Sequence, residues 1–202
     1  MSTDERIDDE TLWGQAAEGE DDAFAEIYRR YADRLHGYLF RRCASYAQAQ
    51  DLTSVVFLEA WRRRGEVRFD DGSVAGWLYG VAGNVLRSSR RSIRRYDAAL
   101  RRLPTDGDEP DLADDVASRV DDEARMAEVL RALDQLPVAE RELLALTAWS
   151  GLSLTEIAAL LDVPVGTVKS RLARLRVRVR GLVADADGLP ETDLTAPVRS
   201  PR

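Results

Sequence analysis

The chain has 202 residues and a formal net charge of −7, a length that suits one large or two small domains. One cysteine (Cys43) and one histidine (His36) exclude a disulfide framework and a Cys/His metal cluster, and we find no nucleophile with a base, no phosphate loop and no metal-ligand spacing. We therefore expect no catalytic residues, no metal and no cofactor. Without a long apolar run or a signal-peptide pattern, we expect a cytoplasmic protein with no membrane insertion.

The charges are segregated along the chain. Residues 1–22 carry a net charge of −8, residues 23–102 carry +8, and residues 103–125 carry −7. The acidic overall composition therefore hides a basic body, which is typical of a protein that binds nucleic acid.

The first helices follow an acidic N-terminus, residues 1–11, that we expect to be flexible. A short helix should place Leu12, Trp13 and Ala16 on one side and end at Gly19. The next helix starts near Asp21 or Asp22 and runs to Cys43. Its aromatic residues fall on one stripe, which indicates a core face: Phe24, Tyr28, Tyr31 and Tyr38.

The third predicted helix, residues 47–64, has apolar residues on almost every side. Such a helix has to be covered on more than one face. Either it is the central helix of its domain, or one face docks onto another protein.

A long fourth helix should follow the loop at residues 65–72, with Ser73 as its N-terminal cap. Five of its residues share a narrow polar and cationic stripe: Trp77, Asn84, Ser88, Arg91 and Arg95. Such a stripe suits single-stranded nucleic acid, because an aromatic or polar pocket receives an unstacked base while arginines follow the backbone. The alternative is a solvated basic face with Trp77 in the core.

Residues 103–123 are acidic, contain two prolines and have no apolar period, which predicts a flexible linker. Helical periodicity resumes at Met126, pauses at Leu136-Pro137 and continues to Ser150. Residues 184–202, rich in Asp, Gly, Pro and Thr, are expected to be a disordered tail.

The stretch from Ser153 to Val183 reads as two short helices joined by a tight turn. Ser153 and Glu156 have the spacing of a capping box, and Val163-Pro164 separates the two periodic runs. The second helix carries six cations and no acid, with an apolar stripe on the opposite side. This pattern predicts a helix-turn-helix whose second helix lies on DNA, rather than a basic helix that only covers a core. The expected fold is all-α, with two small helical domains (12–102 and 124–183) joined by the acidic linker.

Four segments carry a resemblance to a known family. They read FAEIYRRYADRL, DLTSVVFLEAWR, WLYGVAGN, and LPVAERELLAL followed by LTEIAALLDVPVGTVKSRLARLR. In this order, across a linker, the chain resembles bacterial RNA polymerase sigma factors of the extracytoplasmic-function (ECF) type. The resemblance implies that the protein directs core RNA polymerase to promoters, reading the −35 element as duplex and recognising and melting the −10 element. The alternative is a stand-alone dimeric helix-turn-helix regulator.

The resemblance also implies partners and site residues. The partners are core RNA polymerase, through its clamp helices and flap, promoter DNA, and a possible anti-sigma factor. The polymerase-binding residues would be Asp51, Leu52, Phe57 and Trp61. The upstream-element residues would be Thr167, Lys169, Ser170, Arg171, Ala173, Arg174 and Arg178. The downstream-element residues would be Arg68, Phe69, Asp70, Ser73, Trp77, Asn84, Arg87, Ser88, Arg91 and Arg95.

One position departs from the family pattern. The polymerase-binding helix has Ser54-Val55 where relatives often have Gln or Ser followed by Glu. Either affinity for the polymerase is lower, or Val55 faces inward.

Overall fold

The described chain is entirely helical outside its turns. The computed structural model describes residues 7–67, 69, 73–100 and 117–184, which contain eight α-helices and no strand. The helices are α1 (Asp9–Glu18), α2 (Asp21–Cys43), α3 (Tyr46–Arg63), α4 (Val74–Leu100), α5 (Ala117–Leu133), α6 (Val138–Trp149), α7 (Leu154–Leu160) and α8 (Val165–Ala184). The predicted all-α class is confirmed.

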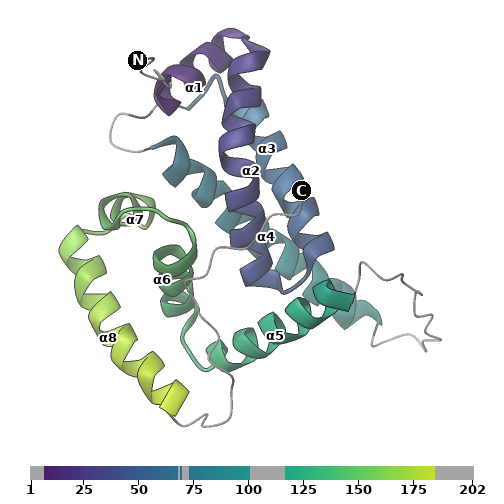
Figure 1. Ribbon diagram of the computed structural model, residues 1–202, viewed down its shortest axis with the longest axis vertical. Helices are drawn as coiled ribbons and strands as arrows, with labels where there is room; N and C mark the ends of the chain where they lie inside the picture. Colours follow the sequence, from purple (N-terminus) through teal and green to yellow (C-terminus); the bar gives the residue numbers. More distant parts are fainter. Residues whose placement is uncertain (1–6, 68, 70–72, 101–116, 185–202) are drawn as a thin grey trace.

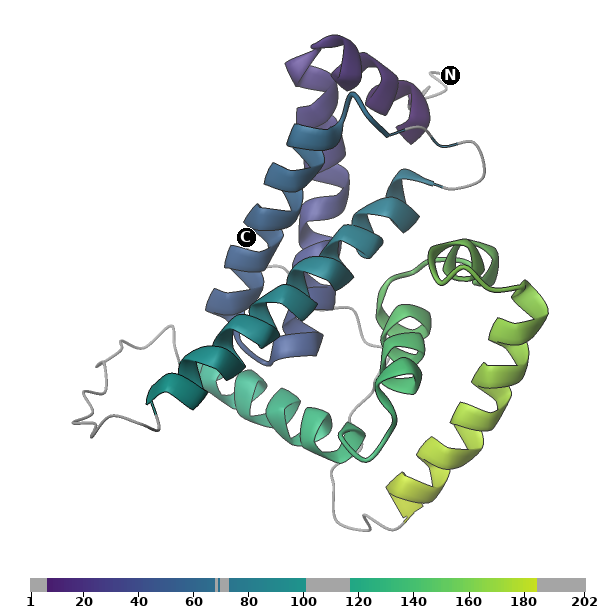
Figure 2. The same ribbon diagram turned by 180° about the vertical axis from the view of Figure 1, so that it is seen from behind.

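The helices form two bundles that pack against each other (Figures 1 and 2). In the first bundle, α2 packs against α1, α3 and α4; in the second, α8 packs against α6 and α7. The bundles meet where α2 contacts α5 and α6, and where α4 contacts α7. As a result α6 lies between the first bundle and α8, which forms the outer edge of the molecule in both views.

Helix α1 begins earlier than the sequence suggested. The Asp8 carboxylate accepts a hydrogen bond from the Thr11 amide (2.9 Å) and caps a helix that starts at Asp9, inside the segment we expected to be flexible. The helix ends, as predicted, at Gly19, whose φ of 107° lies in the left-handed region that favours glycine.

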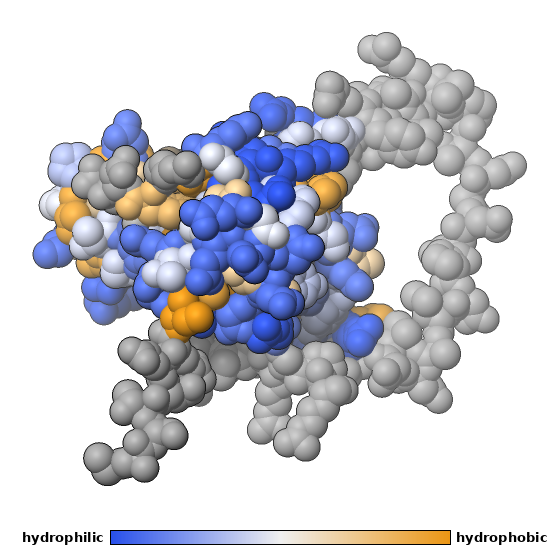
Figure 3. Space-filling view, turned by 90° about the horizontal axis from the view of Figure 1, so that it is seen from above, coloured by the Kyte–Doolittle hydropathy of each residue, from blue (hydrophilic) through white to orange (hydrophobic). Residues whose placement is uncertain are grey.

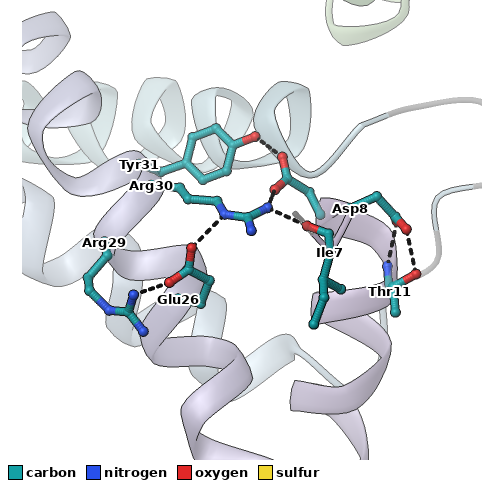
Figure 4. Close-up of polar contacts among 8 residues, drawn as sticks. Ile7, Asp8, Thr11, Glu26, Arg29, Arg30 and Tyr31 are labelled. Carbon is teal, nitrogen blue, oxygen red and sulfur yellow. Dashed lines mark hydrogen bonds and ion pairs between the residues drawn. The ribbon is translucent and has the colours of Figure 1, made fainter. Parts of the chain in front are cut away.

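A polar cluster holds α1 against α2 (Figure 4). The Arg30 guanidinium donates to Asp9 (2.7 Å), to the Ile7 carbonyl (2.7 Å) and to Glu26 (2.9 Å). Tyr31 also donates to Asp9. Burial, together with this hydrogen bond, raises the pKa of the Tyr31 phenol. The start of α1 is therefore bound to α2 as well as capped.

The core of the first bundle follows the predicted stripes. Ile27 and Leu35 of α2, Val56 of α3 and Leu78 of α4 have no exposed surface. Tyr31 and Tyr38 are buried as expected, but Tyr28 is 48% exposed, because it lies at the edge of α2 against Phe57.

The second bundle extends further toward the N-terminus than its predicted boundary. Helix α5 starts at Ala117, so residues 117–123 are helical although we assigned them to the linker. Its core includes Leu146, Ile157, Val168 and Leu175, each at most 2% exposed.

The molecular surface is mostly polar. At the end of the molecule where α1 lies, hydrophilic residues predominate and apolar residues are exposed in separate patches (Figure 3). Within the described residues, no helix combines the length and the apolar character needed to cross a lipid bilayer.

Two glycines of α1 allow a stability test with opposite expected signs. Gly19→Ala should lower the free energy of unfolding by roughly 1 kcal/mol, because the left-handed conformation is strained for alanine while no atom within 4 Å obstructs its Cβ. Gly14→Ala, in the exposed middle of α1 with an equally open Cβ site, should raise it by about 1 kcal/mol. Urea unfolding measures both. Equal effects of the two changes would contradict the assigned end of α1.

Candidate nucleic-acid interface

The predicted helix-turn-helix is formed by α7 and α8. The Ser153 hydroxyl accepts from the Glu156 amide (3.2 Å), and the Glu156 carboxylate accepts from the Ser153 amide (2.8 Å), so the capping box is confirmed. After α7, Asp162 adopts a left-handed φ of 53°, which Asp tolerates better than most residues. Helix α8 then begins directly after Pro164. The turn thereby fixes the direction of α8 relative to α7.

Helix α8 buries the side that its periodicity indicated. Val168, Leu172 and Leu175 are buried, and Val165 and Val179 are half-buried. The side chain of Leu182, also predicted on this stripe, lies outside the described residues. The inner face of α8 is thus occupied by the core of the second bundle.

The outer face of α8 carries the residues predicted to contact the upstream element. Exposed residues on it are Lys169, Ser170, Arg171, Ala173 and Arg174, and Thr167 is half-buried. The Ser170 hydroxyl donates to the Thr167 carbonyl (3.0 Å), and Arg174 Nε donates weakly to the Ser170 carbonyl (3.4 Å). Val177, between the cations, is 70% exposed. Small side chains near the start of α8 would let its backbone approach base edges.

Arg178 differs from the other cations of this set. Its Nη1 lies 2.7 Å from each carboxylate oxygen of Glu140, which belongs to α6. A carboxylate therefore lies beside α8 although α8 itself has none, and it orients Arg178 toward α6.

The stripe on α4 is partly exposed and partly covered. Asn84, Ser88 and Arg91 are exposed, and Trp77 is half-buried. Phe69, in the connection before α4, is half-buried against Trp13, with ring centroids 5.4 Å apart. Arg68, Asp70 and the side chain of Arg95 lie outside the described residues.

Two carboxylates of the second bundle bind residues predicted to contact the downstream element. Glu142 of α6 lies 2.7 Å from the Arg87 guanidinium, which also donates to the Asn84 side chain (2.7 Å). Glu156 of α7 accepts from the Ser73 hydroxyl (2.6 Å). Ser73 also caps α4, as predicted, by accepting from the Gly76 amide (3.0 Å).

Further contacts hold the bundles together next to these pairs. Arg34 of α2 donates to the Ser150 carbonyl (3.1 Å), and the Tyr46 amide donates to Glu123 (2.6 Å). Gly80 of α4 faces α7 so closely that an added Cβ would lie 2.9 Å from Leu160 Cδ1. The absence of a side chain at Gly80 therefore permits the close approach of α4 and α7.

The electrostatics of Glu156 favour contact between the two bundles at neutral pH. We call the arrangement in which the bundles are in contact the closed arrangement. Burial of Glu156 acts to raise the pKa of its carboxyl, but the hydrogen bonds from Ser73 and Ser153 outweigh it and lower the pKa below the usual value. The stabilisation is therefore present above that usual value and is lost as the pH falls through the lowered pKa. The Arg87–Glu142 pair is partly solvated and contributes only about 0–1 kcal/mol.

The predicted polymerase-binding residues of α3 do not share one exposed surface. Asp51 is exposed, but Leu52 and Phe57 are each 5% exposed in the core, and Trp61 is half-buried beneath the Arg64 guanidinium, 3.6 Å from its ring centroid.

Helix α3 exposes two large apolar side chains, and neither of them was assigned to polymerase binding. Val55 is 46% exposed and Leu58 is 49% exposed, so the alternative in which Val55 faces inward is wrong. Helix α3 packs in the core on one side and is exposed on another, and its docking onto another protein stays a prediction.

Sequence reasoning also missed Trp13, Glu142 and Glu156 as neighbours of the predicted DNA-binding residues. Glu156 was identified only as a cap, and nothing in the spacing of these three residues indicates contacts across 55 to 83 positions. Within the described ranges, no group of three or more His, Cys, Asp or Glu side chains is arranged to hold a metal ion.

The comparisons with known proteins cover both bundles. Residues 27–96 match the family described as Sigma-70 region 2, and residues 126–179 match the family described as Sigma-70, region 4. The chain is 32% identical over 171 residues to RNA polymerase sigma factor CarQ of Myxococcus xanthus, covering 84% of this chain and 94% of CarQ. It is 32% identical over 160 residues to ECF RNA polymerase sigma factor SigE of Mycolicibacterium smegmatis, covering 79% of this chain and 61% of that longer relative.

A solved structure is similar over the same extent. The structure of CnrH in complex with the cytosolic domain of CnrY matches with a TM-score of 0.66 and 26% identity, covering 89% of this chain and 99% of CnrH. The likeness therefore extends over both bundles.

Reversing the charge of Glu142 should open the contact between the bundles. Glu142→Lys places a cation opposite Arg87, and a change of about 1 kcal/mol corresponds to a roughly fivefold shift toward the separated arrangement. Small-angle X-ray scattering should show a larger radius of gyration. Glu140→Lys is the matched control, because Glu140 pairs with Arg178 inside the second bundle. An unchanged radius in both variants would contradict the assigned role of Glu142.

Proposed function

Because this chain belongs to the ECF group of RNA polymerase sigma factors, we propose that it directs core RNA polymerase to promoters through two DNA contacts, one on α8 and one on α4. Helix α8 reads the upstream (−35) element as duplex, and the α4 stripe recognises and melts the downstream (−10) element. The protein contributes no catalysis of its own.

The observation that carries this proposal is the outer face of α8. Six cations and no acid lie on this helix, and the small side chains of Ser170 and Ala173 are exposed among them. Flanking cations bind phosphates regardless of sequence, whereas an Arg that reaches a base edge can pair with guanine at two atoms. Arg174 is the candidate for that base contact, since it is exposed and forms no ion pair with a carboxylate of the described residues.

Two of the residues assigned to the downstream element become available to DNA only when the bundles separate. Arg87 and Ser73 are bound to Glu142 and Glu156 in the closed arrangement, so the same groups are not available to DNA. We therefore infer that the free protein binds DNA weakly and that assembly with the polymerase parts α6 and α7 from α4. Two modest DNA contacts held on one enzyme then act at a raised effective concentration.

Helix α3 is the proposed docking element for the polymerase clamp helices, and the second bundle contacts the flap. The exposed side of α3 offers Asp51 together with the apolar side chains of Val55 and Leu58. Burying these two side chains compensates, at roughly 25 cal/mol per Å² of apolar surface, for the polar contact that Val55 replaces.

An anti-sigma factor is a further proposed partner. CnrH was solved in complex with the cytosolic domain of another protein, CnrY. A partner of that kind would act here by stabilising the closed arrangement, in which carboxylates of α6 and α7 already bind residues of the downstream site.

Reconstitution with core RNA polymerase from the same organism tests this function. The assembled enzyme should transcribe a subset of templates from a pool with randomised upstream sequence. Leu58→Glu should reduce polymerase binding by tenfold or more, because it places a charge in an apolar contact. Val120→Glu is the matched control: Val120 is 51% exposed on α5, outside the docking surface.

The same assay separates the competing function. A stand-alone dimeric regulator would bind one duplex sequence tightly without polymerase and would leave transcription start sites on the template pool unchanged. Gel-shift measurements with and without core polymerase, at a stated salt concentration, distinguish the two functions.

Arg174→Ala should cost about 1–3 kcal/mol at one position of the upstream element and relax the base preference there. Arg178→Ala is the comparison, because its guanidinium is held by Glu140 and should affect all sequences alike. Binding of the assembled enzyme to promoter duplexes changed at single positions measures both variants. Uniform weakening by Arg174→Ala would identify Arg174 as a phosphate contact instead.

A further inference from the structure

Trp13 of α1 lies where α1, α4 and the connection between α3 and α4 meet. Its side chain is 2% exposed. Its ring centroid is 5.4 Å from that of Phe69 with the planes at 82°, and 5.1 Å from that of Trp77 with the planes at 67°. Phe69 and Trp77 are only half-buried, so Trp13 contacts both rings while leaving part of each accessible.

Hydrogen bonds attach α1 to the end of α3 as well. Trp13 Nε1 donates to the Arg64 carbonyl (3.1 Å), and Arg64 Nε donates to the Ala16 carbonyl (3.1 Å). Arg64 is the residue that ends α3. Helix α1 therefore contacts the start of the α3–α4 connection at Arg64, its middle at Phe69, and α4 at Trp77.

The position of α1 relative to α2 is itself fixed. The ion pair between Asp9 and Arg30 and the hydrogen bond from Tyr31 bind the start of α1 to α2, and Gly19 ends the helix with a tight turn (Figure 4). Trp13 is thus carried by a rigid element rather than by a loop. Helix α1 also precedes the stretch matched to Sigma-70 region 2, which begins at residue 27.

From these contacts we propose that α1 is part of the downstream-element site and that Trp13 is a positioning residue for the rings of Phe69 and Trp77. The inference rests on the proposed function, in which the downstream element is recognised and melted, and on the resemblance, which implies that Phe69 and Trp77 belong to that site. Base–aromatic stacking depends on the orientation of the ring, and edge contacts with a fixed indole remove the rotamers in which a half-exposed ring would turn away. Trp13 then sets base preference without touching DNA.

The competing explanation is that Trp13 only stabilises the first bundle. The two roles predict different values of one measurable ratio, the affinity for an oligonucleotide with the preferred base divided by the affinity for one with a substituted base. A variant that merely loses folded protein binds every oligonucleotide less by the same factor, which leaves the ratio between preferred and substituted bases unchanged. A variant that frees Phe69 and Trp77 lowers that ratio at the captured position.

The test uses the full chain assembled with core polymerase and a pool of single-stranded DNA oligonucleotides with randomised positions. After the wild-type preference has been selected from the pool, affinities are measured for oligonucleotides changed at single positions. Trp13→Leu should lower the ratio at one position by roughly fivefold or more. Trp13→Phe, which keeps a ring but loses the hydrogen bond to Arg64, should give an intermediate ratio. Upstream duplex binding and polymerase affinity should stay unchanged.

Trp149→Phe provides the matched control, because Trp149 is half-buried at the end of α6 and belongs to the second bundle. Ratios equal to wild type in both Trp13 variants, with or without a uniform loss of affinity, would overturn the inference while leaving the proposed function intact. A wild-type assembly that discriminates between no bases at all would overturn the proposed function and the inference together. If Trp13→Leu does not assemble with the polymerase, the test depends on Trp13→Phe: a lowered ratio supports the inference and a wild-type ratio overturns it.

Discussion

The two bundles are held together in part by the hydrogen bonds that Glu142 and Glu156 accept from Arg87 and Ser73. Both carboxylates belong to the second bundle, and both donors belong to the first bundle at positions assigned to the downstream element. The acids thus occupy places where a DNA strand would bring phosphate oxygens or base edges. One chain therefore contains both the donors and the carboxylates that bind them, and in the proposed function DNA and α6–α7 would compete for the same donors.

This competition can be regulated because each contact is weak. A partly solvated ion pair contributes about 0–1 kcal/mol, and the hydrogen bonds between the bundles contribute about 1 kcal/mol each. Leu160 adds apolar contact where Gly80 leaves room for it. A partner that binds only one arrangement then needs a differential affinity of a few kcal/mol to change the populations. Polymerase on the exposed side of α3 and a protein that bridges the bundles would shift the equilibrium in opposite directions.

Helix α1 connects the packing of the first bundle with its proposed DNA site. Its acidic start is bound by Arg30 and Tyr31, and its centre carries the indole that contacts Phe69 and Trp77. The same helix is also hydrogen-bonded to the end of α3, because Arg64, which stacks on Trp61, donates to a carbonyl of α1. The end of α3 and the proposed downstream site are therefore both in contact with α1.

Most helices, the capping box at Ser153 and Glu156 and the buried side of α8 could be predicted from the sequence, because each depends on spacings of three or four residues within one segment. The family could be predicted as well, because four motifs follow one another in a fixed order along the chain. The sequence did not place the start of α1 or α5, since Asp8 and the residues after Ala117 read locally as acidic and irregular. The exposure of Val55 and Leu58 and the burial of Leu52 and Phe57 follow from the packing of α3 alone, because this helix is apolar on nearly every side and periodicity cannot choose between its faces. Packing also places Glu142, Glu156 and Trp13 beside the residues assigned to the downstream element, because contacts between residues far apart in the chain depend on how whole helices pack and leave no periodic trace in the sequence.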